Sequence, residues 1–87
     1  MDQNWIDNFR IKLEQHYGWP SLYIFKFIVP NGKEEELQSL FPNHTFTKKN
    51  STQGRYTSLT MQIMASSSDS VIEVYQKAAV VEGLIAL

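Results

Sequence analysis

The run of residues 22–29 constrains the fold more than any other segment of the chain. It reads LYIFKFIV, is rich in aromatic and β-branched residues, and lies between Pro20 and the turn-forming Pro30-Asn31-Gly32. Such a segment is typical of a β-strand. Alternate residues of a strand point to opposite faces, and here both faces are mostly apolar. We therefore expect a central strand of a sheet that is covered on each side.

Segments with helical and strand periodicity surround this run. Trp5, Ile6, Phe9 and Leu13 predict an amphipathic helix over residues 2–17, which ends at Gly18. The remaining expected elements are a helix over residues 33–40, an edge strand over 44–51, a turn at 52–54, a strand over 55–65, a helix that follows the serine cap at 66–68, and a last strand over 80–87. Ser70 and Glu73 have the spacing of a capping box for the last helix.

This order predicts an α+β fold, a ferredoxin-like βαββαβ sandwich with an extra N-terminal helix. Two helices would lie on one face of a four-stranded antiparallel sheet. The chain divides into an N-terminal amphipathic helix, residues 1–18, and a ferredoxin-like domain, residues 19–87. The face under the helices is expected to hold Tyr23, Phe25, Phe27, Leu59, Met61 and Ile63.

Composition excludes several classes of function. The chain has no cysteine, so disulfides, thiolate catalysis, zinc–sulfur sites and iron–sulfur clusters are ruled out. A small secreted domain usually needs disulfides, so their absence favours the cytoplasm. The net charge of −1 gives no general attraction to nucleic acid or to anionic lipid. We see no signal peptide and no apolar run that would span a membrane.

The residues that carry common catalytic chemistry do not form a recognisable motif. His16 and His44 are the only histidines, and no metal-ligand spacing includes them. The four glycines are isolated, so there is no glycine-rich phosphate loop. We therefore expect no enzyme activity, no catalytic residue, no metal and no cofactor.

Three stretches of the chain resemble the YbeD-like family of small bacterial proteins. They are Trp19-Pro20 with the strand up to Pro30, the run STQGRYTSLT at residues 51–60, and Val74-Tyr75 with the closing VEGLIAL. The resemblance implies a ferredoxin-like fold similar to ACT-type regulatory domains, which bind small ligands such as amino acids at dimer interfaces. It implies no catalytic residue, because the family has no agreed biochemical activity.

The face of the sheet opposite the helices is the expected binding surface. It would hold Ile24, Lys26, Ile28, Tyr56, Ser58, Thr60 and Gln62, a mixture of aliphatic and polar residues that suits a protein partner or a second copy of the chain. The first five of these are the expected contacts. Either the N-terminal helix folds across this face, or that helix docks on a second subunit. The basic residues Lys48, Lys49 and Arg55 would bind an anionic group, such as a small acidic metabolite or a partner's carboxylate.

Two function classes follow from this surface. The first is a non-catalytic regulatory or interaction module of the ACT type, acting through its sheet face or edge. The alternative is weak RNA binding through the same face and the Lys48, Lys49 and Arg55 cluster, since a ferredoxin-like sheet can stack bases on aromatic side chains. The near-neutral charge argues against nucleic acid as the main partner.

Overall fold

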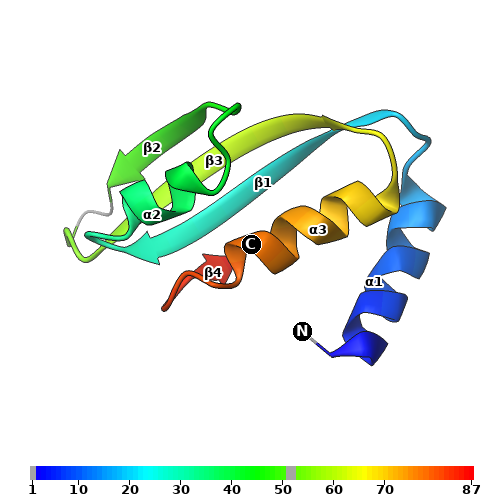
Figure 1. The fold of residues 1–87 in the computed structure, drawn as a ribbon, viewed down its shortest axis with the longest axis horizontal. Coiled ribbons are helices and arrows are strands. Elements are labelled where there is room, and N and C mark those ends of the chain that lie inside the picture. Colours follow the sequence, from blue (N-terminus) through cyan, green and yellow to red (C-terminus); the bar gives the residue numbers. More distant parts are fainter. Residues whose placement is uncertain (1, 51–52) are drawn as a thin grey trace.

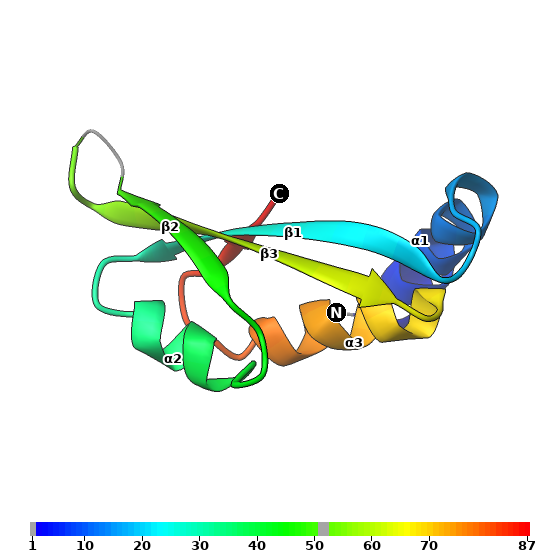
Figure 2. The ribbon, with the colours of Figure 1, turned by 90° about the horizontal axis from the view of Figure 1, so that it is seen from above.

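Four strands form one antiparallel sheet, and helices α2 and α3 lie on the same side of it (Figure 1, Figure 2). The computed structural model describes residues 2–50 and 53–87. The elements are α1 (Gln3–His16), β1 (Ser21–Pro30), α2 (Glu34–Ser39), β2 (Phe46–Asn50), β3 (Tyr56–Ala65), α3 (Ser68–Ala78) and β4 (Ile85–Ala86). The strand order β2-β3-β1-β4 confirms the α+β, ferredoxin-like prediction. Ser51 and Thr52, where the edge strand was expected to end and the turn to begin, lie outside the described residues.

The core lies between the sheet and the helices. The register pairs Phe25 with Met61 and Phe27 with Leu59, and all four side chains are completely buried. The predicted assignment of these residues to the helix-covered face is therefore confirmed. The expectation that β1 is covered on both sides is wrong, because Ile24 on the opposite face is 55% exposed. An exposed aliphatic face on a central strand cannot be distinguished from a covered one by periodicity alone.

Helix α1 forms as predicted but does not cross the face of the sheet opposite α2 and α3, because it packs beside α3. Its inner residues Ile6 and Leu13 are buried in the common core, and the Phe9 ring lies 5.5 Å from that of Tyr75 on α3. Arg10 also forms an ion pair of 2.9 Å with Asp69 at the start of α3. The helix ends at His16, and Tyr17 after it is already in extended backbone, so the helix stops before Gly18, where it was expected to end.

The last strand is much shorter than expected. Residues 79–83 form turns, in which Gly83 has a φ of 81°, and β4 contains only Ile85 and Ala86. One further bond, of 2.9 Å, joins the Leu87 N–H to the Lys26 carbonyl. Val81 of this apolar run is buried, whereas Val80, Ile85 and Leu87 are exposed. Among the described helices, none has the length and apolar character needed to cross a membrane.

The cap of α3 differs by three positions from the predicted capping box. Ser67 is the N-cap: its hydroxyl accepts a bond from the Ser70 N–H, and the Ser70 hydroxyl accepts one from the Ser67 N–H. Ser67→Ala should therefore lower the free energy of unfolding by about 1 kcal/mol. Glu73→Gln should change it by less than about 0.5 kcal/mol, since the predicted box does not form. Urea unfolding of both variants tests this, and an equal loss in both would contradict it.

Candidate functional site

An uncovered sheet face carries most of the exposed aliphatic side chains of the sheet. Strand pairing places side chains of paired residues on the same face. Ile24 pairs with Gln62, Ile28 pairs with both Ser58 and Ile85, and Leu22 pairs with Met64. Ile85 is 51% exposed and Met64 is 64% exposed, so aliphatic groups on three strands remain in contact with solvent. We call this surface, formed by Leu22, Ile24, Lys26, Ile28, Thr47, Lys49, Tyr56, Ser58, Thr60, Gln62, Met64 and Ile85, the open face.

The five predicted contact residues share this surface. Lys26 pairs with Thr60, Ile28 pairs with Ser58, and Tyr56 pairs with Pro30 at the end of β1. Together with Ile24 they run along β1 and β3 on the side away from α2 and α3. The structure therefore brings them onto one surface, while their role as contacts stays a prediction. Nothing within the described part of the chain covers that surface, since α1 packs beside α3 (Figure 2).

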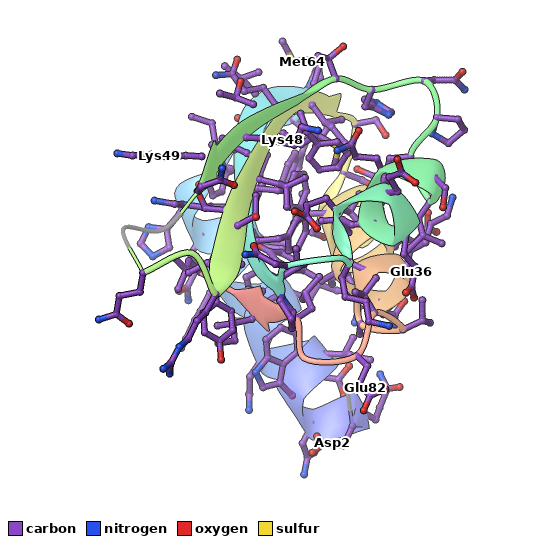
Figure 3. All side chains as sticks on the ribbon, turned by 90° about the vertical axis from the view of Figure 1, so that its left-hand side faces the viewer. Asp2, Glu36, Lys48, Lys49, Met64 and Glu82 are labelled. Carbon is purple, nitrogen blue, oxygen red and sulfur yellow. The ribbon has the colours of Figure 1, made fainter. Side chains whose placement is uncertain are left out.

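The predicted basic cluster is divided by the sheet. Lys49 pairs with Ser58 and belongs to the open face, and Figure 3 shows it pointing away from the helices. Lys48 pairs with Leu59 and therefore lies on the helix-covered side. The structure therefore does not bring Lys48 and Lys49 together on one face, while the binding of an anionic group by Lys48, Lys49 and Arg55 stays a prediction. Because consecutive residues of a strand point to opposite faces, the sequence already contained this signal.

A polar cluster at the start of β3 was not predicted from the sequence. Thr57 is 1% exposed, and its hydroxyl lies 2.8 Å from Asn31 Oδ1, 3.0 Å from Glu34 Oε2 and 3.2 Å from Asn50 Oδ1. These groups come from β2, β3, the turn after β1 and the start of α2. The cluster therefore fixes the β2–β3 hairpin against α2. A threonine in register with the inward-facing Leu59 and Met61 was the available signal.

Hydrogen bonds hold the pKa of Glu34 below its usual value. Its carboxylate accepts bonds from its own N–H and from the Gly32 N–H at 2.6 Å; the Thr57 hydroxyl and the Lys48 charge act in the same direction, while partial desolvation opposes them. Each of these donors favours the charged form of the carboxylate. The folded state therefore binds a proton at Glu34 less readily than the unfolded state does.

This shift predicts a pH dependence of stability. A carboxyl whose pKa is lower in the folded than in the unfolded state stabilises the folded state. This stabilisation is complete above the pKa of the unfolded state, here 4.5, and is lost as the pH falls through the pKa of the folded state. Between pH 6 and pH 3, Glu34→Gln should therefore lose less stability than the wild type. Urea unfolding across this range measures the difference. Glu35→Gln is the matched control, because the hydrogen bonds described above are made by the Glu34 carboxylate. If Glu34→Gln loses as much stability as the wild type over this pH range, the prediction is contradicted.

A shallow groove lies between the end of β3, α3 and the loop after α2. It has a volume of about 280 Å³. It is lined by Phe41, His44, Ile63, Met64, Ala65, Ser66, Ser70, Glu73, Val74 and Lys77. The Lys77 ammonium lies 5.4 Å from the centre of the Phe41 ring, so part of its charge is already engaged. None of Lys48, Lys49 and Arg55 lines this groove, so it is separate from the residues that were predicted to bind an anion. Among the described residues, no group of three His, Asp or Glu side chains is placed to hold a metal ion.

The comparisons with known proteins identify a family and no activity. A family model described as "Protein of unknown function (DUF493)" matches residues 18–85, which include β1, β2, β3, α2 and α3 and end at the first residue of β4. Neither the curated proteins nor the solved structures that were searched contain a match to this sequence. The match covers most of the chain and agrees with the resemblance to the YbeD-like family. The chain belongs to the DUF493 family, a family of small domains of unknown function.

Proposed function

We propose that this protein is a non-catalytic interaction module that binds a protein partner through the open face. The observation that supports the proposal is the exposure of Leu22, Ile24, Met64 and Ile85 on one uncovered side of the sheet. Apolar side chains that gather on one surface within a polar surround are typical of protein-binding sites. The N-terminal helix was the obvious candidate to cover this surface, and it packs elsewhere.

The charges on the open face indicate the chemistry of the partner. Lys26 and Lys49 lie on this face among the aliphatic groups, and none of its residues is acidic. A partner with an apolar centre and carboxylates at its rim would complement this pattern. A regulatory role of the ACT type in the cytoplasm, with a small anionic ligand near the two lysines, would use the same surface.

The RNA alternative has less support than the protein partner. Tyr23, Phe25 and Phe27 of β1 lie on the helix-covered side, and Phe25 and Phe27 are completely buried, so these two rings cannot stack on bases. Tyr56 is the aromatic residue of the open face. A single aromatic group and two lysines are a small set for single-stranded nucleic acid, which is usually bound by several stacked bases.

A substitution at Ile24 tests the proposal. Ile24→Asp places a charge in the apolar part of the open face, whereas Val80→Asp places one in the turn after α3, where the side chain is similarly exposed. In parallel affinity capture from a lysate of the source cells, we expect a protein that the wild type and Val80→Asp retain and Ile24→Asp loses. Urea unfolding verifies that both variants are folded.

Two outcomes would count against the open face as a protein-binding surface. The first is a partner that both variants retain equally. The second is capture of RNA whose affinity falls steeply with added salt, because release of counterions gives nucleic-acid binding that dependence, while an apolar interface responds little.

A further inference from the structure

The outer edge of β1 is only partly paired. Strand β4 pairs with Phe27 and Ile28, and the Leu87 N–H reaches the Lys26 carbonyl, but β4 does not extend further (Figure 1). Alternate residues of a strand direct their backbone N–H and C=O groups to the same edge. The backbone groups of Leu22 and Ile24 therefore point to the edge of β1 at which the Lys26 carbonyl binds Leu87. Within residues 2–50 and 53–87, no strand pairs with Ser21–Phe25 on that side.

An apolar groove lies beside this unpaired edge. It has a volume of about 340 Å³ and is lined by Trp5, Phe9, Tyr23, Tyr75, Ala86 and Leu87. The Tyr23 and Tyr75 hydroxyls contact each other at 3.2 Å, and the Phe9 ring contacts Tyr75. Tyr23 belongs to the helix-covered side of β1, as do its neighbours Phe25 and Phe27. A residue added opposite Tyr23 would point its side chain to the same side, and therefore into the groove.

We propose that the β1 edge at Ser21–Phe25 is a strand-addition site for a short, extended, apolar segment of a partner protein. The segment would run antiparallel to β1, in line with β4, and would place one aromatic or aliphatic side chain among Trp5, Phe9, Tyr23 and Tyr75. Its backbone would exchange hydrogen bonds with Leu22 and Ile24, which is the mode of recognition by β-augmentation. The proposal does not depend on the open face, because these bonds are made by backbone groups at the edge.

The length of the unpaired edge favours a short segment over a second copy of the chain. In an antiparallel pair of two β1 strands with the two Tyr23 residues opposite each other, Pro20 of each chain would lie opposite Lys26 of the other. That position is already taken, because the Lys26 carbonyl binds Leu87. A second β1, with its 10 residues, is therefore too long for the part of the edge between Ser21 and the position of Leu87. A short extended segment fits there.

Synthetic tetrapeptides test the proposal. The probe is the amidated peptide Val-Phe-Val-Thr with a free amino terminus; its phenylalanine would face Tyr23 and its first and second valines would pair with Ile24 and Leu22, so that it ends before Lys26, where Leu87 already binds. N-methylation of the second valine removes an N–H that points to β1 and should weaken binding by about tenfold or more. N-methylation of the phenylalanine removes an N–H that points away, so this peptide is the matched control. Replacing the phenylalanine with aspartate should also abolish binding, because the groove is apolar.

Nuclear magnetic resonance titration gives both affinity and location. We expect the amide protons of Leu22 and Ile24 to exchange more slowly with the peptide bound. The proposal is overturned if the parent peptide and its leucine and tryptophan analogues all fail to bind below about 1 mM. It is also overturned if the methylated peptides bind equally, or if the shifts map to Lys49 and Ser58 on the open face.

A pair of protein variants provides an independent test. Ile24→Pro removes the outward N–H and leaves the bonds between β1 and β3 in place, because those are made by the alternate residues. Ile24→Thr keeps the N–H and is the control. We expect Ile24→Pro to bind the peptide at least about tenfold more weakly and Ile24→Thr within about threefold. If Ile24→Pro does not fold, the N-methylated peptides still decide the question. A dimer of the wild type that the peptide dissociates would assign the edge to a second copy and overturn the proposal.

Discussion

Phe25→Ala is expected to lower the free energy of unfolding by about 4 kcal/mol, the largest effect that we predict for any single substitution. Phe25 is completely buried at the centre of β1. Its ring lies 4.7 Å from that of Tyr23, 5.2 Å from that of Tyr75 and 6.1 Å from that of Phe27. Truncation would remove these contacts and leave a cavity between the sheet and α3, because a close-packed core relaxes only in part.

The expected loss is large compared with the stability of a small domain. A chain of this length is typically stable by about 4–13 kcal/mol, so Phe25→Ala would leave a substantial unfolded fraction if the chain is near the lower end. Urea unfolding followed by tryptophan fluorescence measures the change. Ile24→Thr is the matched control on the next residue, since it keeps a β-branched side chain at an exposed position and should cost less than about 1 kcal/mol. A loss below about 1 kcal/mol for Phe25→Ala would contradict the assignment of this ring to the core.

Gly83→Ala is expected to have the second largest effect, a loss of about 3 kcal/mol. Gly83 has a φ of 81°, a conformation that is strained for residues with a side chain. A Cβ atom at this position would also lie 2.7 Å from Pro30 Cγ and 3.2 Å from Pro30 Cδ. The proline ring cannot rotate away, so the turn before β4 would have to shift. The bond between the Leu87 N–H and the Lys26 carbonyl would then weaken.

A second glycine separates the two causes of this effect. Gly54 also has a positive φ, of 71°, but a Cβ atom there would meet nothing within 4 Å. Gly54→Ala should therefore lower the free energy of unfolding only by the cost of placing a side chain at a positive φ, about 1 kcal/mol. Urea unfolding gives the two losses, and hydrogen exchange at the Leu87 amide reports on β4. Equal losses in the two variants would show that Pro30 does not confine the backbone at Gly83.

Alternation along β1 and β3 was enough to predict which residues share a face. Phe25, Phe27, Leu59 and Met61 were expected under the helices, and the structure places them there. The same alternation placed Ile24, Ile28 and Ser58 on the opposite side. This works because the side-chain period of a strand is fixed by its backbone, so no knowledge of neighbouring elements is needed. It also explains why Lys48 and Lys49, which are consecutive in β2, lie on opposite faces of the sheet.

The end of the chain shows where local pattern was misleading. The apolar run at residues 80–87 was expected to form a strand, because exposure of so many apolar groups is unfavourable. The structure turns the chain at Gly83 and keeps only Ile85–Ala86 in the sheet. Hydrophobicity measures the tendency to be buried, but strand formation also needs an adjacent edge within reach of the backbone. That requirement depends on where α3 ends relative to β1.

Local periodicity and turn residues were sufficient to predict the order of the elements and the inward face of β1 and β3, but not the extent of β4. The packing of α1 against α3, the exposure of the open face and the lack of a partner strand for the β1 edge beyond Leu87 within the described residues became visible only in the folded chain. The physical reason is that a pattern shows which side chains need burial. It does not show which of several apolar surfaces will provide that burial, since this depends on contacts between segments that are distant in the chain.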